Sequence, residues 1–343
     1  MFKDLLSKNK RLAVIGLGYV GLPLALEFAK YFSVIGFDIN DDRINMMKNG
    51  IDPSCEIDPK AFENKDILFT TDVNDLHYAH FFVVAVPTDI DVHQVPDLSP
   101  LIKAAKTVGA VIKKDDYVVF ESTVYPGCTE EDCIPVIKKA IQNREVLTTN
   151  QSTPNDLKPE IDFKYGYSPE RIVPGDKVRP LPSILKIVSG CDEVALEEIA
   201  QVYGQIITAG IFKAESIKVA EAAKVIENTQ RDINISLMNE LSIIFDKMNI
   251  DTIAVIEAAG TKWNFHKYRP GLVGGHCISV DPFYLLHKAK KLGHDPQVIA
   301  AGRRVNDYIP HFIAKRLVQT LIEVGKNPGT CKVLVKGITL RKT

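Results

Sequence analysis

Near its amino terminus the chain reads Arg11-Leu12-Ala13-Val14-Ile15-Gly16-Leu17-Gly18-Tyr19-Val20-Gly21. The apolar run that ends at Ile15 predicts a buried strand, and a Gly-x-Gly-x-x-Gly turn follows it directly. Helical spacing of apolar residues covers Leu22 to Tyr31, a second apolar run covers Val34 to Phe37, and Asp38 closes that run. This order is typical of a dinucleotide-binding unit, because the glycines let backbone N–H groups at a helix N-terminus approach a pyrophosphate.

The acid after the second run indicates which dinucleotide is bound. Asp38 lies 17 residues after Gly21, where a carboxylate hydrogen-bonds a ribose 2′-hydroxyl and repels a 2′-phosphate. NAD is therefore favoured over NADP, although the nearby Arg43 weakens the preference. A glycine triplet alone is more often an ordinary turn, but the strand before it and the acid after it favour a cofactor site. We expect that site to include Gly16, Gly18, Tyr19, Val20, Gly21, Asp38 and Arg43.

Two further apolar runs predict buried strands that end in polar residues. Phe81 to Val86 is followed by Pro87-Thr88, and Tyr117 to Phe120 is followed by Glu121-Ser122-Thr123. In doubly wound sheets the ligand crevice lies just beyond the carboxyl ends of the strands. We therefore expect Pro87, Thr88 and Thr123 to contact the cofactor. The alternative is that Thr88, Ser122 and Thr123 only cap the helices that follow.

The bulk composition excludes several classes of function. The chain has 343 residues, of which 45% are hydrophobic and 25% charged, enough for two ordinary globular domains. Its net charge of -1 gives no broad attraction to nucleic acid or anionic lipid. The six cysteines form no Cys-x-x-Cys pair, so we expect neither a metal site nor a disulfide framework. No signal peptide or membrane span is predicted, and we expect a soluble, cytoplasmic protein.

A helical connector is predicted from Ile211 to Ala259, where the chain has neither glycine nor proline. Apolar residues at helical spacing mark one face of it. These are Leu237, Leu241, Ile244, Phe245 and Met248. A helix of this length exceeds the size of a small domain, so we expect it to span between domains or to pack against a partner subunit. Asn249 or Asp251 is placed to cap a second helix that begins near Thr252.

Two polar residues of this connector have a possible chemical role. Lys224 and Asn228 are four residues apart and project from the same side of a helix. An ammonium and an amide aimed into one cleft would stabilise negative charge on a substrate oxygen. Taken alone, however, such a pair is more often on a solvated face.

Two other segments carry candidate chemistry. Glu170 and Arg171 lie in a turn-rich stretch, where they are either a catalytic carboxylate with its neighbour or a surface ion pair. Cys277 follows Gly274-Gly275-His276 and precedes Asp281 by four residues, which indicates an activated thiol. A dinucleotide site together with a thiol suggests an enzyme that removes hydride and also forms a covalent bond to its substrate.

Four segments, in this order, closely resemble the UDP-glucose/GDP-mannose dehydrogenase family. They read G-L-G-Y-V-G-L-P-L-A from Gly16, E-S-T-V-Y-P-G from Glu121, Y-S-P-E-R-I from Tyr167, and R-P-G-L-V-G-G-H-C-I-S-V-D-P-F-Y from Arg269. The G-G-H-C-I form is most similar to the branch that acts on UDP-N-acetylhexosamines (UDP-GlcNAc or UDP-GalNAc), which supply polysaccharide precursors in bacteria and archaea. The resemblance spans residues 11 to 340.

The resemblance implies a four-electron oxidation of a sugar C6 alcohol to a carboxylate, with reduction of two NAD. Cys277 would trap the aldehyde as a thiohemiacetal, and loss of a second hydride would give a thioester that water cleaves. Asp281 would assist the thiol or the water as a base, one helical turn away if that segment is helical. Lys224 and Asn228 match the oxyanion-stabilising pair of the family.

The resemblance also implies the remaining site residues. Glu170 matches a carboxylate thought to help with proton transfer, and Thr123 joins the catalytic set. The substrate-binding residues would be Glu170, Lys224, Asn228, Arg269, Gly274 and Gly275.

The expected architecture is α/β. An amino-terminal Rossmann-like doubly wound parallel sheet is followed by a long-helix connector domain and only the first strand of a second Rossmann-like domain. We place an NAD-binding domain at 1–210, a helical central and dimerisation domain with the cysteine loop at 211–310, and the start of a truncated UDP-sugar-binding domain at 311–343. The last apolar run, Val333 to Leu340, lacks a sheet to join, so we expect it to fray.

Three alternatives stay open. One is a UDP-glucose 6-dehydrogenase. Another is a single-step hydroxyacid dehydrogenase, in whose reaction Cys277 would have no catalytic role. The third is a truncated NAD-binding form with weak or no activity.

Overall fold

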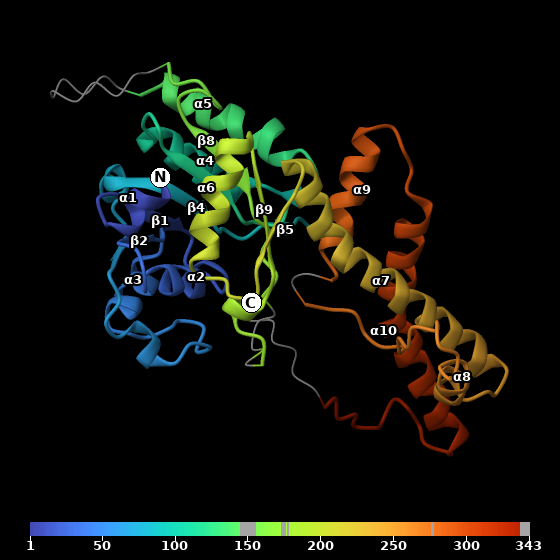
Figure 1. The fold of residues 1–343 in the computed structure, drawn as a ribbon. Helices are drawn as coiled ribbons and strands as arrows, with labels where there is room; N and C mark the ends of the chain where they lie inside the picture. The colour runs from blue at the N-terminus through green and yellow to red at the C-terminus, as the bar shows by residue number, and fades with distance from the viewer. Residues whose placement is uncertain (145–155, 173–175, 177, 276–277, 337–343) are drawn as a thin grey trace. The chain divides into compact units, whose positions relative to one another are not determined.

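The computed structural model describes residues 1–144, 156–172, 176, 178–275 and 278–336 (Figure 1). The chain forms two compact units. Unit 1 comprises Met1–Asp91 and Pro96–Lys224, and unit 2 comprises Val92–Val95 and Val225–Thr343.

Unit 1 is built on an eight-stranded sheet, counted over its described residues. In spatial order the strands are β10 (Ile211–Lys213), β9 (Lys186–Gly190), β8 (Lys164–Tyr167), β7 (Tyr117–Phe120), β4 (Ala79–Val84), β1 (Arg11–Ile15), β2 (Val34–Phe37) and β3 (Ile67–Thr70). All neighbouring pairs are parallel except β8 with β9. Because β1 lies between β2 and β4, the strand order reverses at β1, which is the switch point of a doubly wound sheet. The predicted fold class is confirmed.

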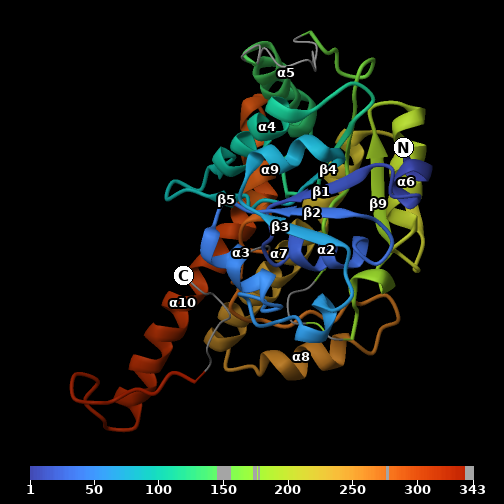
Figure 2. The same ribbon diagram turned by 90° about the vertical axis from the view of Figure 1, so that its left-hand side faces the viewer.

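Helices cover both faces of this sheet, as Figure 2 shows. The helices of unit 1 are α1 (Phe2–Leu6), α2 (Gly21–Phe28), α3 (Asp41–Lys48), α4 (Ser99–Val111), α5 (Ile134–Gln142) and α6 (Glu193–Gly204). Short 3₁₀ turns occupy Pro59–Phe62, Val73–Tyr78 and Leu181–Ser183, a π-helical turn occupies Thr129–Cys133, and a small hairpin joins β5 (Asp89–Ile90) to β6 (Pro96–Asp97).

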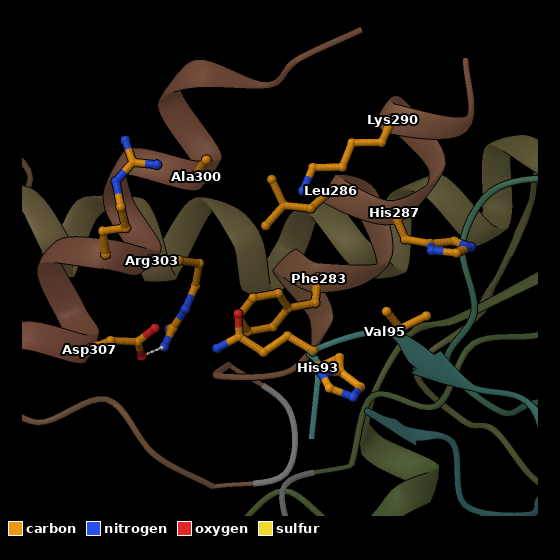
Figure 3. A pocket seen from close by; sticks show the side chains of 11 residues that line it. His93, Val95, Phe283, Leu286, His287, Lys290, Ala300, Arg303 and Asp307 are labelled. Atoms are coloured by element: carbon orange, nitrogen blue, oxygen red, sulfur yellow. Dashed lines mark hydrogen bonds and ion pairs between the residues drawn. The ribbon is translucent and has the colours of Figure 1, made fainter. Parts of the chain in front are cut away.

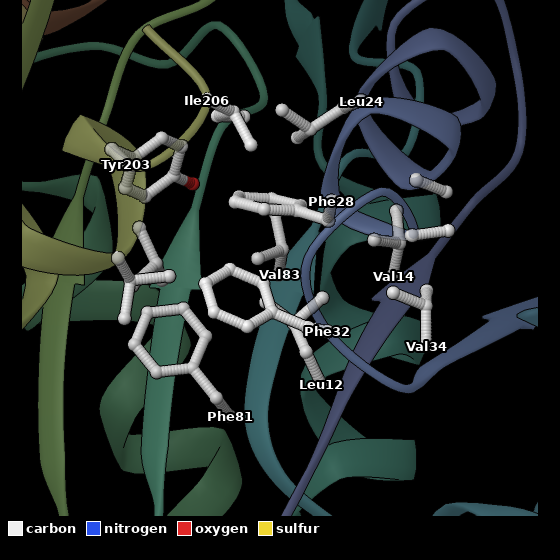
Figure 4. Packing of buried hydrophobic residues seen from close by; sticks show 14 of the residues in the cluster. Leu12, Val14, Leu24, Phe28, Phe32, Val34, Phe81, Val83, Tyr203 and Ile206 are labelled. Atoms are coloured by element: carbon white, nitrogen blue, oxygen red, sulfur yellow. The ribbon is translucent and has the colours of Figure 1, made fainter. Parts of the chain in front are cut away.

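The main core lies where α1, α2, α3 and α6 pack on one face of the sheet. Phe28 of α2 meets Tyr203 of α6 edge to face, with ring centroids 5.5 Å apart, over the strand residues Val14 and Val83 (Figure 4). Burying a large apolar side chain contributes roughly 1.5 to 3 kcal/mol. This packing fixes where the strands end, and the site is built at those ends.

The residues just after four central strands form a row at the carboxyl edge of the sheet. Gly16 N donates to Phe37 O, Ala85 N to Ile15 O, Glu121 N to Val84 O, and Ser168 N to Phe120 O. The backbone ladder therefore continues one residue past each strand. It brings the glycine turn, the Pro87-Thr88 segment, the Glu121 segment and the Ser168 segment to one edge.

Unit 2 is helical over its described residues. Its elements are most of α7 (Ile217–Lys247), which begins in unit 1, and α8 (Thr252–Ala259), α9 (Asp281–Lys291) and α10 (Gln297–Glu323). Arg303 of α10 is buried and pairs with Asp232 of α7 at 2.5 Å, while Asn306 Nδ2 donates to the same carboxylate at 2.7 Å. This buried network joins α10 to α7. No helix among the described residues has the length and apolarity needed to cross a membrane.

Several predicted boundaries need correction. The helix after the glycine turn ends at Phe28 rather than Tyr31, and the strand predicted at 81–86 is β4, Ala79–Val84. The connector is not helical throughout, because Ile211–Lys213 pairs with β9 as an edge strand. Asp251, not Asn249, caps α8, since its Oδ1 accepts from Ile253 N at 2.9 Å.

The end of the chain is described only to residue 336. Residues 333–336 form no strand, and the side chains of Val333, Leu334 and Val335 are exposed. The rest of the predicted strand, 337–340, lies outside the described residues.

Candidate functional site

The glycine turn has the geometry of a dinucleotide cradle. Gly16 has φ +88°, and a Cβ on Gly21 would lie 1.8 Å from Gly16 O, so neither position accepts a side chain. A Cβ on Gly18 would meet nothing within 4 Å. Glycine is thus required by packing at 16 and 21, whereas the space beside Gly18 is open at the start of α2. That open space fits the pyrophosphate of NAD.

Asp38 is fixed beside this turn. Its Oδ2 accepts from Leu17 N at 2.9 Å and its Oδ1 from Asn40 N at 3.0 Å, which leaves the carboxylate half-buried at the end of β2. Arg43 Nη2 donates to Leu17 O at 2.8 Å. The arginine predicted to weaken the NAD preference is therefore anchored to the turn.

Replacing Asp38 by alanine is expected to weaken NAD binding by about 10- to 100-fold, because a charge-assisted hydrogen bond contributes about 1.5 to 3 kcal/mol. The NAD-to-NADP affinity ratio should fall as well, since the repulsion of a 2′-phosphate is lost. Calorimetry with each cofactor measures both effects, with Asp42→Ala, an exposed acid of α3, as the control. An unchanged ratio in Asp38→Ala would contradict the assigned contact.

The threonines predicted for the cofactor site lie together. Thr88 Oγ1 donates to Thr123 O at 2.7 Å, and Ser122 Oγ donates to Val86 O at 2.6 Å. The capping alternative is wrong, because the residues that precede the next helical elements are Leu98 and Cys128. These hydroxyls instead join two adjacent strand ends. Pro87 is exposed at the same edge.

Glu170 is not a surface residue. Its side chain is buried, Oε1 accepts from Arg171 N at 2.5 Å and from Ile172 N, and the Arg171 guanidinium donates to Leu185 O at 2.9 Å. The surface ion pair considered from the sequence does not form. The carboxylate is held at the carboxyl edge by its own turn.

Lys224 and Asn228 lie one turn apart on α7, and neither is solvated. Their exposed fractions are 7% and 9%, so the solvated-face alternative is wrong. Among the described residues no hydrogen bond or ion pair reaches Lys224 Nζ. A buried ammonium without a counter-charge is costly, and an anionic ligand would remove that cost.

Asn228 is joined to Asp281 within unit 2. Asn228 Nδ2 donates to Asp281 Oδ2 at 2.6 Å, and both side chains are buried. Asp281 is the first residue of α9, and residues 278–280 form a turn rather than helix. Two residues that the family resemblance pairs in one site are thus in direct contact.

The glycine-rich segment before α9 is only partly described. Cys277 and His276 lie outside the described residues. Gly275 has φ +90°, and a Cβ on either Gly274 or Gly275 would meet no atom within 4 Å. Arg269 is exposed and pairs with Glu257 at 3.2 Å. The open space beside the two glycines is compatible with close approach of a substrate.

Sequence reasoning missed Glu221, which ties α7 to the loop after β7. Its Oε2 accepts from Gly127 N at 2.5 Å and its Oε1 from Thr129 N at 2.9 Å. Burial raises the pKa of this carboxyl from 4.5 to about 7, although the bonds from Thr129 and Gly127 oppose the shift. Its position three residues before Lys224 on one helix face was the available signal.

The free energy of unfolding is expected to fall as the pH rises from about 4.5 to about 7, because the folded protein then holds a proton that the unfolded chain has released. The loss is on the order of 3 kcal/mol. Urea unfolding at pH 5 and pH 8 measures it. Glu221→Gln should flatten the dependence, whereas Glu197→Gln, at an exposed site on α6, should not. Equal pH dependence in all three proteins would disprove the assignment.

A cavity of about 260 Å³ lies within unit 2, between α9, α10 and residues 93–95. Figure 3 shows Phe283, Leu286 and Lys290 of α9 opposite Ala300 and Arg303 of α10, with Arg303 paired to Asp307. None of the predicted site residues lines it.

Comparison with known proteins agrees with this geometry. The profile of the UDP-glucose/GDP-mannose dehydrogenase family, NAD binding domain, matches residues 10–207, and that of its central domain matches residues 218–308. Protein CapL of Staphylococcus aureus is 52% identical over 97% of this chain and 76% of its own length. UDP-N-acetyl-D-glucosamine 6-dehydrogenase of Salmonella typhi is 51% identical over 97% and 75%. The solved structure of UDP-D-ManNAc dehydrogenase from Pyrococcus horikoshii is similar with a TM-score of 0.81 and 32% identity, over 93% of this chain and 73% of that one.

Proposed function

The chain belongs to the UDP-glucose/GDP-mannose dehydrogenase family and is an NAD-dependent nucleotide-sugar dehydrogenase, and from this premise we propose that it oxidises the C6 alcohol of a UDP-N-acetylhexosamine to the uronic acid. The relative named for UDP-N-acetyl-D-glucosamine shares about half of its residues with this chain, whereas those named for UDP-N-acetyl-D-mannosamine share about a third. This difference in sequence identity is the observation that supports a UDP-N-acetylhexosamine substrate. We assign the product to polysaccharide precursor synthesis.

The proposal gives each part of the chain a task. Residues 1–210 would hold NAD, which when bound accepts the hydride. Residues 211–310 would carry the groups on the substrate side. The buried ammonium of Lys224, which pairs with no group in the described part of the chain, supports a role at a developing alkoxide, with Asn228 as the second donor. The contact between Asn228 and Asp281 keeps the carboxylate that acts as base close to the oxyanion donor.

We propose Cys277 as the nucleophile. A thiol suits a second oxidation of the same carbon, because its adduct with the aldehyde still carries a hydride and the resulting thioester is readily cleaved by water. Gly274 and Gly275 would let the substrate approach the backbone beside it, and Arg269 would contact the sugar nucleotide.

Steady-state kinetics with UDP-GlcNAc, UDP-GalNAc and UDP-glucose, each with NAD, tests the substrate. We expect kcat/KM for at least one N-acetylhexosamine substrate to exceed that for UDP-glucose by 10-fold or more, since about 1.4 kcal/mol of differential contact produces that ratio. A preference for UDP-glucose would overturn the assignment.

We further propose that the enzyme acts in the cytoplasm as a homodimer that packs through α7. Apolar side chains of this helix are exposed at Leu237 and Ile244, and Met248 is exposed in the turn just after it; all three belong to the face marked by the sequence pattern. Surface apolar residues in such a row favour a partner helix.

A double substitution of Leu237 and Ile244 by glutamate is expected to convert the dimer to monomer, because two buried charges would face their own copies across the interface. Light scattering with size-exclusion chromatography measures the mass. The control replaces Ile39 and Val92 by glutamate, since both are exposed and neither belongs to α7. A variant that keeps the wild-type dimeric mass, or a wild-type protein that is already monomeric, would refute the proposed interface.

A further inference from the structure

A lysine is buried inside unit 1 among carboxylates. Lys186 on β9 has 2% of its surface exposed, and its Nζ donates to Glu121 Oε2 at 2.7 Å and to Pro169 O at 3.0 Å. The ammonium also lies 5.3 Å from the centre of the Tyr203 ring. These contacts fix the charge at one point behind the carboxyl edge of the sheet.

Each oxygen of the Glu121 carboxyl group accepts a hydrogen bond from another side chain. The Lys186 ammonium occupies Oε2, and the Tyr203 hydroxyl donates to Oε1. Burial raises the pKa of the Glu121 carboxyl, while the lysine opposes that shift. Because both oxygens accept hydrogen bonds, the hydrogen-bond pattern is that of a carboxylate.

Glu170 is the second carboxylate near this ammonium. Its Oε2 is buried without a hydrogen-bond partner in the described chain, and it lies 3.9 Å from Lys186 Nζ. Its Oε1 is held by two backbone N–H groups. One oxygen of Glu170 is therefore fixed, and the other faces a positive charge that is shared with Glu121.

A structural salt bridge between Lys186 and Glu121 would not need Glu170. A buried ion pair adds little stability over apolar side chains, and a second buried carboxylate makes it worse by adding an uncompensated negative charge. The buried position of the two carboxyl groups around one ammonium is better explained if Glu170 itself has a role that depends on Lys186. The charged and titratable groups around Glu170 are Lys186 from β9, Glu121 from the end of β7, Tyr203 from α6 and the adjacent Arg171.

We propose that Lys186 is a positioning residue for Glu170, with its buried ammonium divided between Glu121 and Glu170 so that its charge acts on the Oε2 atom of the Glu170 carboxyl group. This rests on the proposed function, which places Glu170 beside the substrate. Glu121 then acts as the competing counter-ion that limits how strongly the ammonium holds Glu170.

The two neighbours should change the titration of Glu170 in opposite directions. Lys186→Gln removes the positive charge and should raise the titration midpoint of Glu170. Glu121→Gln removes the competitor and should lower it. Lys186→Arg should leave it near the wild-type value. Because Glu121→Gln removes a surplus buried charge, it is expected to fold even if Lys186→Gln does not.

Carbon-13 NMR of protein labelled at the glutamate carboxyl carbons measures the midpoint, and the Glu170 signal is the one missing in Glu170→Gln. The control is Lys213→Gln on β10, an exposed lysine paired with Glu197. Opposite shifts in the two variants support the proposal. Midpoints equal to wild type, or shifts of the same sign, would overturn it.

Kinetics separates this inference from the proposed function. With a UDP-N-acetylhexosamine and NAD, the acidic limb of the kcat profile should move with the NMR midpoint, while the NAD dissociation constant stays constant. If the wild-type protein oxidises no nucleotide sugar, the proposed function fails and the NMR titration still decides the role of Lys186. If turnover is normal and the acidic limb is the same in every variant, the positioning role fails alone.

Discussion

Replacing Cys277 by serine is expected to reduce NADH formation from a UDP-sugar by a factor of about 10³ or more, the order lost when a covalent nucleophile is removed from other enzymes. A serine hydroxyl hardly ionises near neutral pH, whereas a thiol does so readily. The aldehyde would then no longer be held for its second oxidation. The assay is the initial rate of absorbance at the NADH band.

The matched control is Cys55→Ser, since Cys55 is exposed in unit 1. It should retain wild-type turnover. NAD affinity should be unchanged in both variants, because neither thiol belongs to the glycine turn. Wild-type rates in Cys277→Ser would remove the thiol from the mechanism.

Replacing Lys224 by methionine is expected to lower kcat by about 10²- to 10³-fold with a smaller effect on KM, the range lost with one oxyanion donor. The physical reason is the buried ammonium, which has no counter-charge among the residues that the structure describes and is suited to an oxygen that becomes negative only during the reaction. Stability should not fall, since an unpaired buried charge is replaced by an apolar side chain of similar length.

Lys218→Met provides the comparison on the same helix. Lys218 is exposed and pairs with Glu131 at 3.1 Å, so its loss removes a surface charge only. Steady-state kinetics and thermal unfolding of both variants make the test. Equal kcat in the two variants would show that Lys224 does not act in catalysis.

Local sequence patterns predicted the fold well where the residues that form them are buried together in one unit. The glycine turn, the strand at Val34–Phe37 and the acid after it are close in sequence and share one unit, so their order alone specified the dinucleotide-binding half. The connector was harder. Ile211–Lys213 carries no helix breaker and becomes a strand only because the edge of β9 is available to pair with it.

The residues of the candidate site could be predicted from the sequence only where they belong to a recognisable motif. Lys224, Asn228 and Glu170 look like ordinary surface residues by composition, and the family resemblance alone marked them. The structure buries all three side chains, which composition does not indicate. Lys186 gave a weak signal, a lysine inside the apolar run Ile184 to Val188, but its partner Glu121 is 65 residues away. Spacing in sequence does not reveal such a contact.

The most direct test of the account is the number of NADH molecules formed per molecule of UDP-N-acetylhexosamine consumed to completion. Two successive hydride removals from one carbon, with the intermediate held on Cys277, predict a ratio of two and a uronic acid product. A ratio of one, with an aldehyde or ketone as the product, would contradict it.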